Sequence, residues 1–177
     1  MLDFTRNHFE LFGLPARYAI DANALESAYR ELQRTVHPDR HAASDDDAAR
    51  RLALQAAARV NEAYRTLADP VERARYLLAL EGVEAFDAAD TSLPVDFLER
   101  QLERRERASL AGDARDEASL EALLDEVHDE ARATESALAA LIDGEHAYAD
   151  ARHRVRELRF LSKLAEDVDA MLAEASA

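Results

Sequence analysis

Apolar residues recur at helical spacing along most of the chain, with polar and charged residues between them. Positions i, i+4, i+7 and i+11 fall on one face of a helix, and a first stripe with this spacing begins at Leu25. Its members are Leu25, Tyr29, Leu32 and Val36. Further stripes begin at Leu52, Leu120 and Ala151, and no stretch shows the strict alternation of a strand. The pattern therefore predicts an all-α protein.

Glycine and proline are scarce, with four of each, and they fall between the predicted helices. Gly13 follows a first short helix, and Pro94 lies in the opening turn of a later one. Asp69 and Pro70 suit the cap and the first position of another helix, which Gly82 ends. These residues predict where several of the helices begin and end.

The stretch 81–93 has no clear apolar stripe and is rich in acidic residues. We therefore expect an N-terminal domain over residues 1–80, a linker over 81–93 and a C-terminal helical domain over 94–177. The connections between the predicted helices of the last segment are short, which favours antiparallel neighbours.

The net charge of −15 is concentrated in the second half of the chain. Residues 1–80 carry 11 Lys and Arg against 12 Asp and Glu, a balance of −1, whereas residues 81–177 carry 11 against 25, a balance of −14. Such a surface repels a polyanion, so nucleic acid is a poor candidate partner.

The chain has no cysteine, which excludes disulfides, thiolate zinc sites and cysteine ligation of an iron–sulfur cluster by this chain.

The tripeptide His37-Pro38-Asp39 lies between two predicted helices. Pro38 has a fixed φ and no backbone N–H, so we expect the preceding helix to end there and the chain to turn. His37 would stand at the helix C-terminus, and Asp39 on a short turn where its carboxylate can meet a partner. Taken alone the tripeptide is a weak motif, which also fits a plain corner between helices.

The segments around this turn resemble the J domain. They are residues 9–15 (FELFGLP), 28–32 (AYREL), 37–39 (HPD) and 60–67 (VNEAYRTL). Three more segments resemble the HscB family of bacterial co-chaperones, and all of them agree in order and spacing along nearly the whole chain. They are residues 74–78 (ARYLL), 97–103 (FLERQLE) and 158–164 (LRFLSKL). The resemblance implies an L-shaped, all-α protein with an N-terminal J domain and a C-terminal three-helix bundle.

The same resemblance implies a function. HscB proteins bring the iron–sulfur scaffold protein IscU to the specialised chaperone HscA and stimulate its ATPase. The expected protein is therefore a cytoplasmic bacterial co-chaperone that does no chemistry itself and needs no cofactor. There is no apolar run long enough to span a bilayer and no basic region feeding an apolar one at the N-terminus, which agrees with a soluble protein without membrane contact.

By resemblance, the chaperone-binding residues are the HPD tripeptide and a basic face beside it. They are His37, Pro38, Asp39, Arg30, Arg34 and Arg40. Asp39 would engage an arginine network of the chaperone's ATPase domain through charge-assisted hydrogen bonds. The alternative is an ordinary solvated helix face with pairs such as Glu26 to Arg30. Val36 stands where many J domains have an aromatic residue, which we expect to affect packing more than docking.

By resemblance, the scaffold-binding patch lies on the C-terminal bundle. Its residues are Leu98, Leu102, Glu103, Glu106 and Phe160. From the residues alone the preferred interpretation is different, with both leucines in the core and the glutamates as a solvated rim. Phe160 lies off the main stripe of its helix, which permits partial exposure. Glu99 and Leu110 depart from the family character, so the edges of the patch stay open.

Two other classes of protein compete with this interpretation. A general J protein serving DnaK-type chaperones would show no preference for the scaffold, and a purely structural helical adaptor would stimulate no ATPase. His37 and His41 have a spacing that could ligate a metal, but the chain has no cysteine and no second clustered pair to complete a zinc site, so no metal is expected. No catalytic or phosphate-binding motif is present, which argues against an enzyme.

Overall fold

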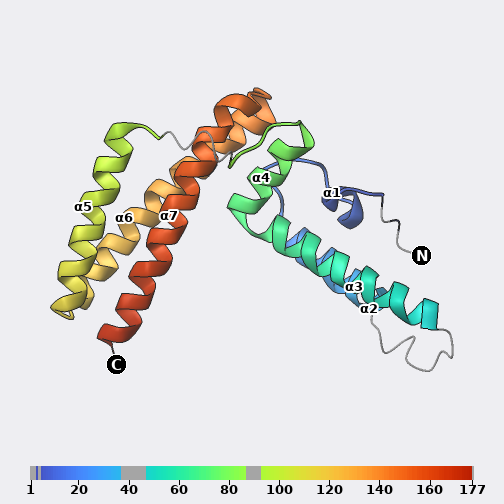
Figure 1. Cartoon of the computed structure of the whole chain (residues 1–177), viewed down its shortest axis with the longest axis horizontal. Coiled ribbons are helices and arrows are strands. Elements are labelled where there is room, and N and C mark those ends of the chain that lie inside the picture. Colours follow the sequence, from blue (N-terminus) through green and yellow to red (C-terminus); the bar gives the residue numbers. More distant parts are fainter. Residues whose placement is uncertain (1–2, 4, 37–46, 87–92, 177) are drawn as a thin grey trace. The chain divides into compact units, whose positions relative to one another are not determined.

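The computed structural model describes residues 3, 5–36, 47–86 and 93–176, and these residues form helices with no strand among them (Figure 1). The helices are α1 (His8–Phe12), α2 (Ala22–Val36), α3 (Asp47–Ala68), α4 (Pro70–Leu80), α5 (Val95–Asp113), α6 (Glu117–Ala139), the π-helical turn η2 (Ala140–Gly144) and α7 (Tyr148–Ala175). The predicted all-α class is confirmed. The contacts divide the chain into two compact units, Met1–Leu77 and Leu78–Ala177. The bounds 1–80, 81–93 and 94–177 stay a prediction.

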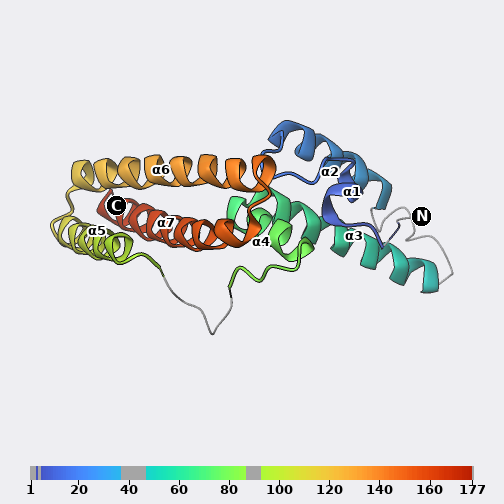
Figure 2. The same cartoon turned by 90° about the horizontal axis from the view of Figure 1, so that it is seen from above.

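In the first unit, α2 and α3 lie side by side, as both views show (Figures 1 and 2). Phe9, Leu25, Val60 and Leu67 are buried in the core of this unit. Leu25, Val60 and Leu67 are stripe positions expected from the sequence, because residues spaced by three or four share one helix face. Gly13 ends α1 with a φ of 66°, a left-handed conformation that glycine adopts without strain.

The ends of α4 follow the predicted signals. The backbone N–H of Glu72 donates to Asp69 Oδ1 at 2.8 Å, which satisfies one of the free donors of the first turn. Pro70 is the first helical residue, where its missing N–H costs no hydrogen bond. Gly82 has a φ of 74° and the chain closes there with a bond from Val83 N–H to Leu78 O at 2.9 Å.

In the second unit, α5, α6 and α7 pack together as a three-helix bundle (Figure 2). Its core comes from all three helices, with Phe97 on α5, Leu123 and Val127 on α6, and Leu161 and Val168 on α7. The expected stripes of α6 and α7 therefore face inward. The C-terminal three-helix bundle implied by the resemblance is confirmed.

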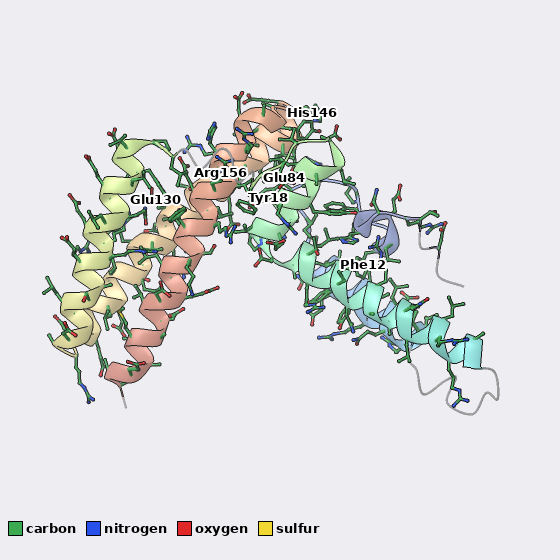
Figure 3. All side chains as sticks on the ribbon, in the orientation of Figure 1. Phe12, Tyr18, Glu84, Glu130, His146 and Arg156 are labelled. Carbon is green, nitrogen blue, oxygen red and sulfur yellow. The ribbon has the colours of Figure 1, made fainter. Side chains whose placement is uncertain are left out.

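The segment that precedes the bundle is attached to α7. Arg156 Nε donates to the carbonyl oxygen of Ala85 at 2.8 Å, and Ala85 is buried (Figure 3). The guanidinium of Arg159 lies 4.6 Å from the centroid of the Phe86 ring, a cation–π geometry. Residues 85 and 86 fall in the stretch expected to be a linker. They pack on α7 and so belong to the second unit.

Candidate functional site

The two groups of predicted site residues fall on different units. His37, Pro38, Asp39 and Arg40 lie outside the described residues, and so does His41. The helix that leads to them, α2, ends at Val36, which is buried. The apolar contact expected of Val36 is therefore present, and the HPD segment follows directly from a residue anchored in the core.

Arg30 and Arg34 lie on the exposed surface of α2. Arg30 forms an ion pair with Glu26 one turn earlier, which is the local pairing that the sequence suggested as an alternative. Arg34 stands in the last turn of the helix, where a cation interacts favourably with the helix dipole. A local pair at the rim does not prevent a charge from speeding association with a partner, so both interpretations of Arg30 remain compatible.

A different face of α2 from the one that carries these arginines is held against α3 by aromatic and polar contacts. Tyr29 stacks on Tyr64 with ring centroids 4.0 Å apart and planes at 18°. Its hydroxyl donates to Asn61 Oδ1 at 3.0 Å. Because Tyr29 is adjacent to Arg30 in sequence, these contacts fix the rotation of α2 about its own axis.

The second group lies on the bundle, and it is exposed. Leu98 is 43% exposed, Leu102 is 62% exposed and Phe160 is 40% exposed. The interpretation preferred from the residues alone, with both leucines in the core, is wrong. Glu103 and Glu106 are exposed as well. The partial exposure inferred for Phe160 from its place off the main stripe is confirmed.

The error has a physical cause in the composition of α5. The buried face of this helix consists of Phe97, Gln101, Arg104, Ala108 and Ala111. Alanine, glutamine and arginine carry a weak hydrophobic signal, whereas the leucines one position later carry a strong one. Sequence reasoning therefore assigned the core to the wrong face of α5, and it missed the burial of Gln101 and Arg104.

Phe160 is joined to α5 by an aromatic contact. Its ring lies edge-on to the ring of Phe97, with centroids 6.3 Å apart and an interplanar angle of 85°. Phe97 is only 3% exposed, so a buried ring of α5 supports a half-exposed ring of α7. Since Leu98 directly follows Phe97, this contact brings Phe160 and Leu98 to the same part of the bundle surface.

Arg104 connects α5 to α6 through ion pairs, on a different side of α5 from Leu98. Its side chain is 7% exposed, and its Nε donates to Glu126 Oε1 at 2.9 Å, with a second ion pair to Glu130. Burial lowers the pKa of the Arg104 guanidinium, but its bonds to Glu130 and Glu126 more than offset this effect and raise the pKa above the ordinary value. Arg100 and Arg107 add ion pairs to the same two glutamates at 3.3 and 2.8 Å.

The described residues include no group of three or more histidines and acids placed to hold a metal ion. Within the same part of the chain, no helix is long and apolar enough to cross a membrane. The candidate site consists of an exposed apolar patch with acidic residues beside it, on a helix held to α6 by the ion pairs of buried Arg104. Such a patch is typical of a protein-binding surface.

Known protein families match both units. The DnaJ domain matches residues 7–76, and the HSCB C-terminal oligomerisation domain matches residues 93–169. The chain is 45% identical over 174 residues to the "Co-chaperone protein HscB homolog" of Burkholderia multivorans, with 97% of both chains covered. It is 44% identical over 172 residues to the homologue of Burkholderia thailandensis, again covering 97% of each.

Solved structures agree with these matches. The chaperone HscB from Vibrio cholerae is 35% identical with a TM-score of 0.85, covering 96% of this chain and 99% of that one. Human co-chaperone protein HscB is 25% identical with a TM-score of 0.86, covering 95% and 83%. A J domain followed by this C-terminal domain defines a J-domain co-chaperone, a regulator of an Hsp70-type chaperone. The chain belongs to the HscB family, the J-domain co-chaperones of iron–sulfur cluster assembly.

Proposed function

We propose that this protein binds an IscU-type iron–sulfur scaffold through its C-terminal bundle and delivers it to an HscA-type chaperone, whose ATPase it stimulates. The observation that carries the proposal is the exposure of Leu98, Leu102 and Phe160 on a bundle whose other large apolar residues mostly face inward. An exposed apolar patch flanked by charged residues is typical of a protein-binding surface. Glu103 and Glu106 form the acidic flank.

The J domain supplies the second contact in this proposal. Asp39 engages arginines of the chaperone's ATPase domain, with His37 and Pro38 shaping the turn. Arg30, Arg34 and Arg40 form the basic face that meets an acidic chaperone surface. The association rate should therefore fall as salt is raised from about 50 to 300 mM, because counterions screen exposed charges. An association rate that does not change with salt would remove the basic face from the docking step.

The protein acts as a bivalent carrier rather than as an enzyme. The bundle holds the scaffold while the J domain holds the chaperone, so the scaffold's effective concentration at the chaperone rises without new contacts between the two. The chaperone hydrolyses ATP, and any cluster is held by the scaffold, because this chain has no cysteine. This work takes place in the bacterial cytoplasm.

The decisive experiment measures the ATPase rate of an HscA-type chaperone with this protein and the scaffold added singly and together. We expect stimulation by this protein and a further, more than additive rise with both. Stimulation that is indifferent to the scaffold would favour a general J protein, and a parallel assay with a DnaK-type chaperone would then show equal stimulation. No stimulation in any mixture would leave only a helical adaptor.

A further inference from the structure

The charged side chains of α5 lie on different sides of the helix according to their sign and their partners. Three arginines, Arg100, Arg104 and Arg107, pair with Glu126 and Glu130 and so mark the side that faces α6. A Cβ placed on Gly112 would lie 3.5 Å from the sulfur of Met171, which marks the side that faces α7. These two contacts fix the direction in which every other residue of α5 points.

Each residue of an α-helix is rotated by about 100° from the one before it. Leu98 and Leu102 then lie about 40° apart on the outer surface of α5, and Glu106 lies about 40° beyond Leu102, away from α7. Glu99 and Glu103 follow farther round in the same direction. All three glutamates are exposed, and none forms an ion pair or hydrogen bond with another described residue. The edge of the leucine pair that lies away from α7 is therefore negatively charged, and no described cation pairs with its glutamates.

The opposite edge of the leucine pair is cationic. Arg105 lies about 20° from Leu98 on the side toward α7, and it is exposed without an ion pair to any residue that the structure describes. On α7 itself, exposed Arg159 directly precedes Phe160 in sequence. Lys163 lies one turn farther along, but it is already bound to Glu166 and Asp167 at 3.2 Å each. The cations on this edge without an ion pair to a described residue are thus Arg105 and Arg159, although the Arg159 guanidinium also lies over the Phe86 ring.

We infer that the patch is electrically polar and that this polarity sets the orientation of its partner. The partner presents an apolar ridge to Leu98, Leu102 and Phe160, with basic groups along the side toward Glu106 and acidic groups along the side toward Arg159. Opposite charges on the two edges favour one orientation of the ridge and disfavour the reversed one, because like charges would then meet. The inference rests on the proposed function, since it takes the scaffold as the partner.

A second copy of this chain could also match such a patch, because opposite edges are complementary to themselves under twofold rotation. The charge of the chain argues against that occupant. Residues 81–177 carry 11 Lys and Arg against 25 Asp and Glu, a balance of −14, so two bundles repel each other. A scaffold protein with both charge types beside an apolar ridge meets no such overall repulsion.

The test is a set of charge reversals measured by titration calorimetry against the scaffold at low and moderate salt. Arg159→Glu, Arg105→Glu and Glu106→Arg should each weaken binding by roughly three- to tenfold, with a smaller effect at the higher salt. Matched controls on α6 are Arg132→Glu and Glu121→Arg, which change exposed charges outside the patch and should keep the parent affinity. Circular dichroism must show parent helix content for every variant.

The outcomes separate this inference from the proposed function. If the arginine reversals bind as the parent does while Leu98→Ala binds weakly, the patch is the binding site but has no orienting polarity. If Leu98→Ala also binds normally, the proposed scaffold site itself is wrong. A patch-dependent dimer in sedimentation experiments, lost in Leu98→Ala, would make a second copy the occupant and overturn the inference.

Photo-crosslinking gives a direct reading of orientation. A photo-reactive side chain at position 159 should attach to a scaffold segment rich in Asp and Glu, and one at position 106 to a segment rich in Lys and Arg. Attachment of both probes to the same segment, or to segments of the opposite charges, would contradict the proposed orientation.

Discussion

Phe160 of α7 meets Phe97 of α5 edge-on, with ring centroids 6.3 Å apart and planes at 85°. Such a geometry places the positive edge of one ring against the negative face of the other, and it adds to the area that the pair buries. The two rings differ sharply in environment, because Phe97 is 3% exposed and Phe160 is 40% exposed. One ring supports the fold, and the other is available to a partner.

Phe160→Ala should separate binding from stability. We expect about a tenfold loss of affinity for the scaffold, since an exposed aromatic in an apolar patch is a typical hot spot. The free energy of unfolding should fall by less than about 1.5 kcal/mol, because much of the ring is already in water. Titration with the scaffold and urea unfolding of the variant measure the two effects.

Phe97→Ala is the matched comparison within the same contact. Removing a buried aromatic leaves a cavity and should lower the free energy of unfolding by about 3–4 kcal/mol. If Phe160→Ala destabilises the protein as much as Phe97→Ala does, the outer ring belongs to the core, and its assignment to the binding patch fails.

The ion pairs of buried Arg104 with the partly exposed Glu126 and Glu130 give a second prediction. Arg104→Ala should lower the free energy of unfolding by about 2 kcal/mol, because it leaves Glu126 and Glu130 partly buried with fewer partners. Arg107→Ala removes an exposed arginine bonded to the same Glu126 and should cost less than about 1 kcal/mol. Chemical unfolding of both variants at one pH makes the comparison.

Arg104→Met tests what the ion pair contributes besides stability. A methionine of similar length fills the buried space without a charge, so it should cost less than Arg104→Ala does. We expect scaffold affinity to fall all the same, because the bonds to α6 no longer fix the rotation of α5. Unchanged affinity with unchanged helix content would mean that packing alone holds the leucines outward.

The buried environment of His8 predicts that the folded protein loses stability in weak acid. Its ring is buried and stacked on Tyr76, with centroids 4.2 Å apart, and its Nδ1 has no hydrogen-bond partner among the described residues. Burial lowers the pKa of His8 below its usual 6.5, the Arg59 charge lowers it further, and Glu62 raises it. The folded protein therefore holds this imidazole neutral.

The sign of the effect follows from proton linkage. Because the folded pKa lies below the unfolded one, the unfolded chain takes up the proton first as the pH falls. The contribution of His8 to stability is complete above a pH near 6.5 and is lost as the pH drops below it toward the folded pKa. In His8→Phe, which keeps the stacking, unfolding of the first unit should depend less on pH between about 7.5 and 5.5.

An NMR titration of the His8 ring provides the direct check. We expect its midpoint below 6.5, the ordinary value for a histidine. A midpoint at or above the ordinary value for histidine would contradict the burial argument, and equal pH dependence of unfolding in His8→Phe would assign the acid sensitivity to other groups.

The sequence was sufficient for features set by local chemistry. Asp69, Pro70 and Gly82 act where predicted, because caps and left-handed turns depend on a few adjacent residues. It was insufficient for α5, where Arg104 is buried although arginine normally stands in water. Its pairing with Glu126 and Glu130, 22 and 26 positions later, offsets the cost of that burial, and no local pattern reports such a pairing. The outward face of Leu98 follows from the same contact.

Asp39→Asn tests the chaperone contact without touching the bundle. The change removes one negative charge and keeps the size of the side chain, so the fold and the scaffold affinity should match those of the parent. Stimulation of the chaperone's ATPase should fall by at least about tenfold, because a charge-assisted pairing is replaced by a neutral one. Glu10→Gln, an exposed acid on α1, is the control and should stimulate normally. Full stimulation by Asp39→Asn would show that the carboxylate plays no part in activating the chaperone, and the J-domain half of the mechanism would then need another residue.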